Sequence, residues 1–288
     1  MFSYFLWTPR KRASLSALFV STMLGLSLFL TACGNTSTTT TTNSSIAAPT
    51  DLIASGTLTV GSDTTYPPQE FIDTTSGKAT GFDIDLITAM AQRMGLQANI
   101  KAANFNTIID DLSAKRYDVV ISAITINDDR KKKVDFVPYF NSGESLLVQK
   151  GNPQNLKTVS DLCGKAVGVQ DGTVEHDDLI AANGAACKSN PIQLTILTNQ
   201  TDVIQLLANK RVVATYQDSP VTDYYIKLNP GQFEVGGSVV NAAPEGIAIR
   251  KGDTSMFNAV QAAFNQVKAD GTYNSLFTKW QLSAAQKV

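Results

Sequence analysis

The chain has 288 residues, of which 43% are hydrophobic and 17% are charged, and its formal net charge is -1. This length and composition are sufficient for a sizeable core, and the balanced charge argues against nucleic-acid binding by electrostatic attraction. The first 32 residues contain three of the 24 Lys and Arg residues and none of the 25 Asp and Glu residues, so the rest carries 21 cations against 25 anions, a net charge of -4.

The N-terminal segment has the order of an export signal. The basic residues "RKR", Arg10 to Arg12, precede an apolar run from Ala13 to Leu30, and small residues follow before Cys33. An apolar run of about 18 residues is also long enough for a membrane-spanning helix. The stretch "LTAC" resembles the lipobox of bacterial lipoproteins, which implies removal of residues 1–32 as a signal peptide and lipidation of the Cys33 thiol.

Residues 33–50 are rich in Ser and Thr and lack apolar periodicity, which is typical of a disordered tether. Further on, Cys163 and Cys187 form an even pair in a chain with an export signal, and this favours a disulfide. Two buried free thiols are the alternative. The single histidine, His176, lies in "EHDD", which is typical of a solvated loop or a first helical turn, so no metal site is expected.

From Asp51 onward the chain alternates between strands and helices. The first series predicts strands at "TLTVGSD", "QANIKAA" and "YDVVISAI", and helices at "GFDIDLITAMAQRMGL" and "NTIIDDLSAKR". The second predicts strands at "KAVGVQDGT", "IQLTILT" and "VVATYQDSP", and helices at "VEHDDLIAANG" and "TDVIQLLANK". We therefore predict an α/β fold in two lobes, each a mainly parallel sheet flanked by helices. Ligands of such sheets bind beyond the carboxyl ends of the strands, at "GSDTTYPP", "AITINDDR", "QDGT" and "YQDSP".

Residues 55 to 283 resemble the amino-acid-binding family of extracellular solute-binding proteins, family 3, the capture subunits of ABC importers. The resemblance rests on six segments in the family's order: "LTVGSDTTYPP", "GFDIDLITAMAQRMGL", "YDVVISAITINDDRKKKVDFVPYFNSG", "DLCGKAVGVQDGT", "DSPVTDYY" and "KADGTYNSLFTKW". It implies a two-lobe periplasmic-binding-protein-like fold of type II with the ligand in the cleft. Lobe 1 would comprise residues 51–142 and 247–288, and lobe 2 residues 143–246, including the hinge strands.

Arg130 lies where this fold would bind its ligand. Asn127 is a suitable N-cap, and two aspartates follow in the first helical turn, so a helix is predicted to begin just after the apolar strand. An arginine there, beside Thr125, can bind a carboxylate with two parallel hydrogen bonds. In the family the matching residues bind the ligand's α-carboxylate. The alternative is an arginine that is solvated, as expected for Lys131 to Lys133.

The resemblance implies further contacts in the cleft. Asp218 matches the carboxylate that receives the ligand's ammonium group, with help from the Ala123 carbonyl, and Thr173 would donate to the ligand's carboxylate. Tyr66 and Phe105 match aromatic residues that cover the ligand's side chain. The alternative for Asp218 is a turn or N-cap role before a proline. The alternative for Tyr66 and Phe105 is that both rings belong to the ordinary core.

Asp63 follows the first predicted strand and carries the specificity prediction. In family members that bind basic or amide amino acids, the matching carboxylate receives the far end of the side chain. No Lys or Arg stands beside Gln170 or Gln217, so the predicted pocket has no cation for a side-chain carboxylate. We therefore expect it to favour arginine, lysine, histidine and glutamine over glutamate and aspartate. The alternative is that Asp63 only caps the "TTYPP" turn. Gln69 stands where the family usually has an aromatic residue, which leaves the packing of this loop open.

The resemblance implies capture of an amino acid outside the cytoplasm, at the cell surface or on the periplasmic side, and delivery by cleft closure to an ABC permease. An ATPase would be a separate subunit, because the sequence lacks G-x-x-x-x-G-K followed by Ser or Thr. We expect a lipid-anchored monomer that needs no cofactor. With one histidine and no cofactor fingerprint it is not expected to be an enzyme. The alternatives are a tethered sensor or adhesin and a dehydratase on the same scaffold.

The anchor prediction is tested at Cys33. We expect Cys33→Ser to leave an unprocessed or mislocalised precursor, because the lipidated thiol is lost. The wild-type protein should partition into detergent. Wild-type protein recovered in the aqueous phase with a Cys33 free of lipid would refute the anchor.

Overall fold

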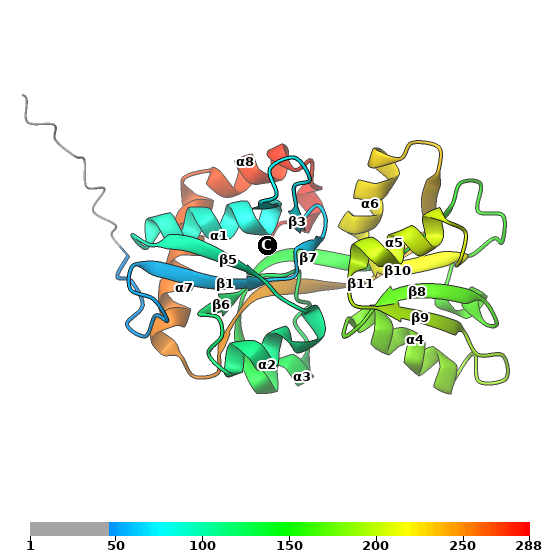
Figure 1. Cartoon of the computed structure of the whole chain (residues 1–288), viewed down its shortest axis with the longest axis horizontal. Coiled ribbons are helices and arrows are strands. Elements are labelled where there is room, and N and C mark those ends of the chain that lie inside the picture. The colour runs from blue at the N-terminus through cyan, green and yellow to red at the C-terminus, as the bar shows by residue number, and fades with distance from the viewer. Residues whose placement is uncertain (1–45) are drawn as a thin grey trace, which may run out of the picture. The chain divides into compact units, whose positions relative to one another are not determined.

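The computed structural model describes residues 46–288 (Figure 1). The predicted signal peptide and lipidated Cys33 lie outside these residues, as does the tether up to residue 45. The remainder of the predicted tether lies against lobe 1, where Ile46 packs on the core and the Thr50 N–H donates to Ser255 Oγ (3.2 Å). Across residues 46–288, none of the helices has the length and apolar content needed to cross a bilayer.

One sheet of eight strands runs through both lobes in the order β5-β1-β6-β11-β7-β10-β8-β9. Its two long central strands, β7 (Val134–Gln149) and β11 (Phe233–Arg250), are antiparallel to each other, and in Figure 1 they cross from one lobe to the other. A second, three-stranded sheet comprises β2 (Thr65–Tyr66), β3 (Glu70–Ile72) and β4 (Ala79–Thr80). The fold is therefore the predicted two-lobe α/β fold.

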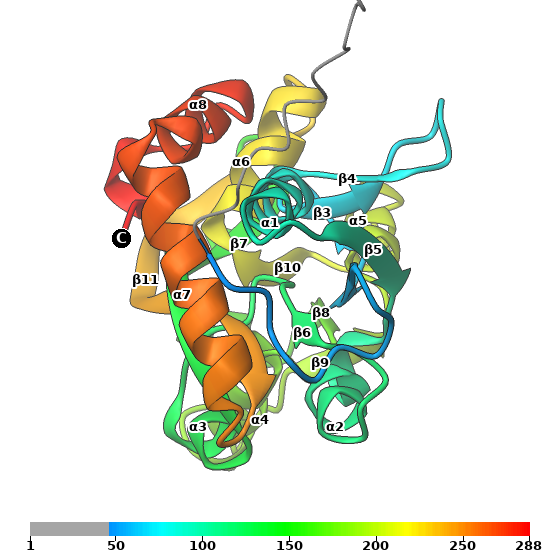
Figure 2. The ribbon, with the colours of Figure 1, turned by 90° about the vertical axis from the view of Figure 1, so that its left-hand side faces the viewer.

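Lobe 1 packs helices on both faces of its part of the sheet. Successive side chains of a strand point to opposite faces, so Val119 joins the core under α1 whereas Val120 joins the core under α2. Figure 2 shows these two helices on opposite sides of the strands. The elements are β1 (Thr57–Ser62), β5 (Gln97–Ala102), β6 (Val119–Val120), α1 (Phe82–Arg93), α2 (Ile108–Ser113), α3 (Asp128–Lys133), α7 (Thr254–Ala269) and α8 (Thr272–Lys279).

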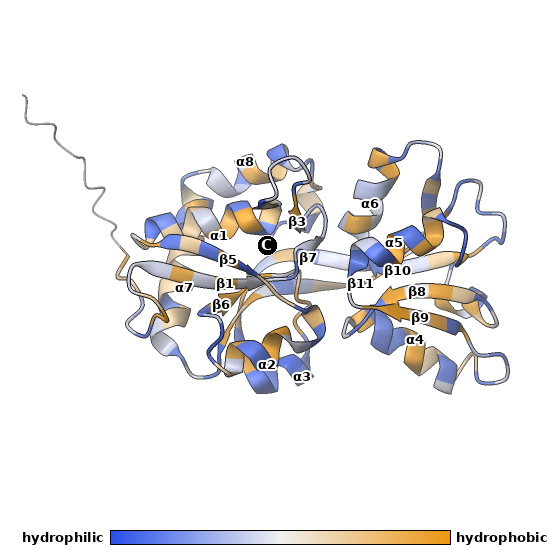
Figure 3. Cartoon of the chain, viewed as in Figure 1, coloured by the Kyte–Doolittle hydropathy of each residue, from blue (hydrophilic) through white to orange (hydrophobic). Residues whose placement is uncertain are grey.

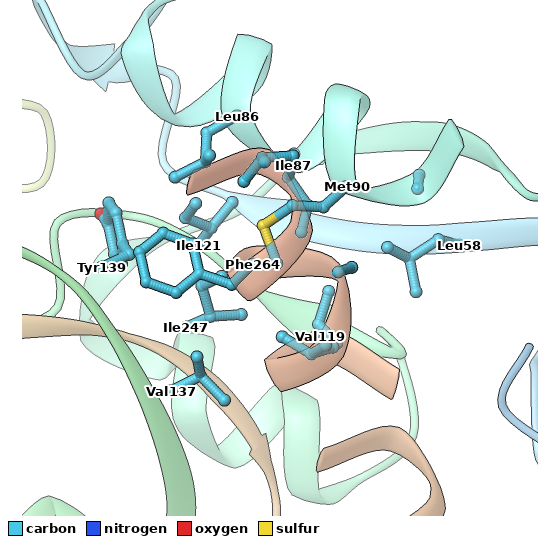
Figure 4. Packing of buried hydrophobic residues seen from close by; sticks show 14 of the residues in the cluster. Leu58, Leu86, Ile87, Met90, Val119, Ile121, Val137, Tyr139, Ile247 and Phe264 are labelled. Atoms are coloured by element: carbon cyan, nitrogen blue, oxygen red, sulfur yellow. The ribbon is translucent and has the colours of Figure 1, made fainter. Parts of the chain in front are cut away.

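The larger core of lobe 1 explains the periodicity of α1. Leu86, Ile87 and Met90 recur at helical spacing and are fully buried against the sheet. Figure 4 shows them facing Phe264 of α7, which returns from the far end of the chain. The C-terminal helices therefore complete the core that the N-terminal elements begin.

Lobe 2 repeats the same construction. Leu146 and Val148 of β7 face one core and Leu147 faces another, so helices cover both sides of the sheet here too. In Figure 3 strands β8 and β9 are mainly hydrophobic, and the helices of this lobe carry both hydrophobic and hydrophilic residues. The elements are β8 (Ala166–Gln170), β9 (Gln193–Leu197), β10 (Ala214–Asp218), α4 (Val174–Gly184), α5 (Gln200–Ala208) and α6 (Ser219–Leu228).

The predicted strands and helices of both series are present, with two differences. The strand predicted at "YDVVISAI" pairs only at Val119–Val120, because the chain then turns through Ala123, whose φ is +46°. The helix predicted at "NTIIDDLSAKR" begins as a 3₁₀ turn, Phe105–Thr107, before α2. Two further 3₁₀ turns are Val159–Leu162 and Ala284–Gln286.

The predicted disulfide is confirmed. Cys163 and Cys187 are bonded with a Cα–Cα distance of 5.0 Å, and their separation of 24 positions encloses α4. Cys187 is 1% exposed in the core of lobe 2. Closing a loop of this size stabilises a fold by roughly 3 to 4 kcal/mol on the chain-entropy estimate.

Candidate functional site

A cavity lies where both lobes meet at the ends of parallel strands. Ala123 follows β6, Thr173 follows β8, and Asp218 ends β10. The volume of this cavity is about 10 Å³, which is room for roughly one water molecule. The cavity is lined by Tyr66, Phe105, Ala123, Thr125, Arg130, Thr173, Val174, Glu175 and Asp218. Most of the residues predicted to bind a ligand are therefore brought together.

Arg130 bridges the two lobes. Asn127 is the predicted N-cap, since its side chain accepts from the Arg130 N–H at 2.8 Å and starts α3 there. The guanidinium donates to the Thr125 carbonyl (2.8 Å) and to the Gly172 carbonyl of lobe 2 (3.1 Å). It also lies 5.5 Å from the centroid of the Phe105 ring. Burial lowers the pKa of Arg130, while the nearby carboxyl of Glu175 opposes this shift.

Gly172 permits the close approach that Arg130 needs. Its φ is +78°, and a Cβ at this position would lie 2.9 Å from the Cα of Asn106 in lobe 1. The neighbouring Asp171 accepts a hydrogen bond from the Asn106 amide at 2.7 Å. In contrast, the lysines that follow Arg130 are exposed and pair with surface aspartates, as Lys132 does with Asp129 at 2.6 Å.

Tyr66 and Asp218 form a second contact between the lobes. The Tyr66 hydroxyl donates to Asp218 Oδ2 (2.9 Å) and accepts from the Asp218 N–H (3.1 Å). Loss of solvation raises the pKa of Asp218 to about 6, although hydrogen bonds from Ser142 and Tyr66 and the charge of Arg130 oppose the shift. The Asp218 carboxyl is thus buried with a hydroxyl partner and a nearby cation.

Asp63 lies beside the cavity rather than in its lining. Its Oδ2 accepts from the Gln170 amide of lobe 2 (2.5 Å), and its Oδ1 accepts from the Thr65 hydroxyl (3.0 Å). The residue is 3% exposed, and desolvation raises the pKa of its carboxyl to about 6. Two residues predicted to lie in the ligand pocket, Asp63 and Gln170, therefore bind each other across the cleft.

Gln217 is also outside the lining. Its amide nitrogen donates to the Thr222 hydroxyl (2.6 Å), and its carbonyl oxygen accepts from the Gln200 amide (3.2 Å). These bonds hold the side chain within lobe 2, behind Asp218.

Residues 58–283 match the family model of bacterial extracellular solute-binding proteins, family 3. The chain belongs to this family. It is 34% identical over 226 residues to the L-cystine-binding protein TcyJ of Escherichia coli (strain K12), covering 78% of this chain and 82% of that protein. This family 3 protein also resembles two solved structures, each 37% identical over 78% of this chain. One is an ancestral arginine-binding protein bound to arginine, with a TM-score of 0.73 and 98% of that chain covered. The other is an ancestral amino-acid-binding protein, a precursor of cyclohexadienyl dehydratase, with a TM-score of 0.70 and 95% covered.

Glu175 lines the cavity, although the sequence did not predict it there. The stretch "EHDD" forms the first turn of α4, as one of the two interpretations allowed, but Glu175 is not solvated and is 1% exposed. Its Oε1 has no hydrogen-bond partner. Burial and the neighbouring Asp218 raise its pKa well above the usual value. Its position in the sequence could have identified it. Glu175 comes two residues after the N-cap Thr173, and side chains in the first turn of such a helix lie near the ends of the strands.

The structure accounts for Gln69, where this family 3 protein lacks the usual aromatic residue. Gln69 is fully buried, and its amide donates to Glu245 Oε2 on β11 at 2.6 Å. Tyr139 places its hydroxyl 3.4 Å from the same oxygen. Gln69 is therefore packed through a polar partner on a strand that crosses between the lobes.

Glu245 lies among other acidic groups with no cation bound to it in the described part of the chain. Desolvation raises its pKa well above the usual value, and the charges of Asp218, Asp83 and Glu175 add to the shift, while the Tyr139 hydroxyl opposes it. Within residues 46–288, no group of three or more His, Cys, Asp or Glu side chains is arranged to hold a metal ion.

We predict that Glu245→Gln stabilises the protein more at pH 8 than at pH 5. An unfolded glutamate ionises near pH 4.3, whereas folded Glu245 keeps its proton to a higher pH. Between these two pKa values the wild-type stability falls as pH rises, by up to about 1.4 kcal/mol per pH unit. Denaturant unfolding at both pH values measures the difference.

Glu234→Gln is the matched control, because Glu234 lies on the same strand, pairs with Lys150 and has a lowered pKa. It should give no such gain at high pH. An equal effect of Glu245→Gln at pH 5 and pH 8 would contradict the prediction.

Proposed function

We propose that this protein captures a polar amino acid outside the cytoplasm and delivers it to an ABC permease by closure of its two lobes. One observation carries the proposal: the interlobe cavity combines the Arg130 guanidinium with the carboxyls of Asp218 and Glu175. These groups are complementary to the carboxylate and the ammonium of an amino acid.

In this proposal the ligand lies across both lobes. Its α-carboxylate binds Arg130 and the hydroxyls of Thr125 and Thr173, because a guanidinium pairs with a carboxylate through two parallel hydrogen bonds. Its ammonium group binds Asp218 and the Ala123 carbonyl. The position of all five residues in the wall of one cavity, or at its strand ends, supports this orientation.

Closure follows from the same contacts. Arg130 and Tyr66 of lobe 1 bind Gly172 and Asp218 of lobe 2 directly. A ligand that touches both lobes adds interactions that only the closed form can make, so it shifts the population toward closure. A permease can then distinguish the loaded protein from the empty one by its shape.

We further propose that the ligand is basic, with glutamine as the second choice. Asp63 is a buried carboxyl, and its Gln170 partner is a neutral amide that a ligand cation can displace. The rings of Tyr66 and Phe105 would then cover the stem of the side chain. The arginine-bound ancestral relative supports this class. Another relative is named for L-cystine, whose far end carries both an ammonium and a carboxylate, so cystine belongs in the ligand panel.

Lipidation of Cys33 would hold a monomeric protein at the outer side of the cell membrane, beside a permease with a separate ATPase subunit. Relatives that bind amino acids support a role in binding rather than catalysis. The sensor alternative differs in its partners, so neighbouring genes for a permease and an ATPase would favour transport. The dehydratase alternative requires turnover of a small carboxylated ring, which an assay of product formation tests.

The central test is calorimetry of the mature protein with basic amino acids, glutamine, glutamate and cystine. We expect Arg130→Ala and Asp218→Ala each to weaken binding by about 2 to 5 kcal/mol, because each removes one partner of a buried charged contact. This is roughly a thirty-fold to several-thousand-fold loss. Lys132→Ala, at an exposed side chain on the same helix as Arg130, should bind like the wild type. Either site variant within threefold of the wild type would remove that residue from the proposed site.

We predict that Asp63→Asn weakens binding of arginine far more than binding of glutamine. The ionised carboxylate is the form that attracts a cation, and its pKa in the closed form is about 6. The ratio of arginine affinity to glutamine affinity should therefore fall as pH drops through about 6 in the wild type, and should depend less on pH in the variant. The ratio cancels the shared titration of Asp218. Tight binding of glutamate by the wild type would overturn the assignment.

A further inference from the structure

Ala123 adopts a backbone conformation that an alanine seldom adopts. Its φ is +46°, in the left-handed region, where the Cβ of an L-residue crowds the backbone at a cost of about 1 to 2 kcal/mol. The conformation persists only if surrounding groups hold it. Because Ala123 lies in the wall of the cavity, what holds it also shapes the ligand site.

Asp83 is the group that binds the Ala123 amide. The Ala123 N–H lies 3.1 Å from Asp83 Oδ2 and 3.2 Å from the Tyr139 hydroxyl oxygen. The Tyr139 hydroxyl itself donates to Asp83 Oδ2 at 2.5 Å. Two donors therefore converge on one carboxylate oxygen, and Asp83 and Tyr139 are both fully buried.

The position of Asp83 suits an ionised acceptor. It lies in the first turn of α1, where the helix dipole favours negative charge. Burial raises the pKa of Asp83 to about 6, although hydrogen bonds from the Tyr139 hydroxyl and the Ala123 N–H oppose the shift. Burial raises the pKa values of the neighbouring Glu70 and Glu245 well above the usual value. A hydrogen bond from a backbone N–H to a charged acceptor is stronger than one to a neutral acceptor.

The Ala123 carbonyl is left available by this arrangement. No group among residues 46–288 donates a hydrogen bond to its oxygen, although the flanking Ile124 carbonyl accepts from the Gly246 N–H at 2.9 Å. We propose that Asp83 is a positioning residue, which never touches the ligand but holds Ala123 in the left-handed conformation and so presents its carbonyl to the ligand's ammonium group. The part of this inference that concerns the ligand rests on the proposed function.

The test compares Asp83→Ala with Asp83→Asn. Asparagine keeps an oxygen that accepts from the Ala123 N–H, whereas alanine removes it. Asp83→Ala should bind the amino acid about 5- to 30-fold more weakly. This factor corresponds to the free-energy cost of the left-handed conformation of Ala123, which the variant no longer offsets. Asp83→Asn should recover most of the affinity. The loss should be smaller for the α-hydroxy analogue, which lacks the ammonium group.

Two further variants isolate the mechanism. Glycine adopts positive φ without the Cβ penalty, so Asp83→Ala should cost less affinity in an Ala123→Gly background than in the wild type. Asp85→Ala is the matched control, because Asp85 lies in the same helical turn but binds Lys279 and Trp280 instead. It should leave affinity and selectivity unchanged.

A ligand-free measurement separates this inference from the proposed function. The amide hydrogen of Ala123 should exchange slowly in the wild type and in Asp83→Asn, and faster in Asp83→Ala. If Asp83→Ala fails to fold, Tyr139→Phe should accelerate the same amide by a smaller factor. Unchanged exchange at Ala123, or equal losses for the amino acid and its hydroxy analogue, would overturn the positioning role. A wild-type protein that binds no amino acid would instead refute the proposed function, while the exchange data would still decide whether Asp83 holds Ala123.

Discussion

The contact of the half-buried Arg130 guanidinium with both lobes is the interaction on which their closed arrangement depends. A cation taken out of water must find partners, because the cost of desolvation is several kcal/mol. Arg130 finds them in backbone carbonyls on both sides, Thr125 in lobe 1 and Gly172 in lobe 2. These carbonyls carry partial charge only, so a carboxylate in the cavity would improve the pairing. The same guanidinium thus joins the lobes and lines the cavity between them.

Three buried carboxyls lie in or beside the cavity that Arg130 lines. Asp63, Glu175 and Asp218 all have raised pKa values, and for each the loss of solvation is the largest cause. Such groups remain protonated unless a nearby cation stabilises the ionised form. Their polarity is consistent with a ligand that brings at least one ammonium group into the cleft. The Tyr66 hydroxyl donates to Asp218 and the Gln170 amide donates to Asp63. Both donors are neutral, so a ligand cation can replace them.

The sequence predicted those features that depend on local pattern. Helical spacing identified α1, and Asn127 before two aspartates identified the start of α3 beside Arg130. Features that depend on residues distant in the sequence could not be predicted from local pattern. The burial of Glu175 follows from the opposite lobe covering the start of α4, and the partner of Gln69 lies 176 positions away, at Glu245. The left-handed turn at Ala123 was likewise hidden, because its hydrogen-bond acceptor comes from another element, α1.

Residues 124–126, next to the cavity, are hydrogen-bonded to β11, one of the two strands that cross between the lobes. The Ile126 N–H donates to the Pro244 carbonyl (2.8 Å), and the Gly246 N–H donates to the Ile124 carbonyl (2.9 Å), so residues 124–126 are fastened to β11. This strand is one of only two that cross between the lobes in the described sheet. Rotation of the lobes about β7 and β11 must therefore be absorbed next to Thr125 and Ala123. Because the Asp83 carboxylate fixes the other side of this segment, lobe 2 can move over a binding surface whose own geometry stays constant.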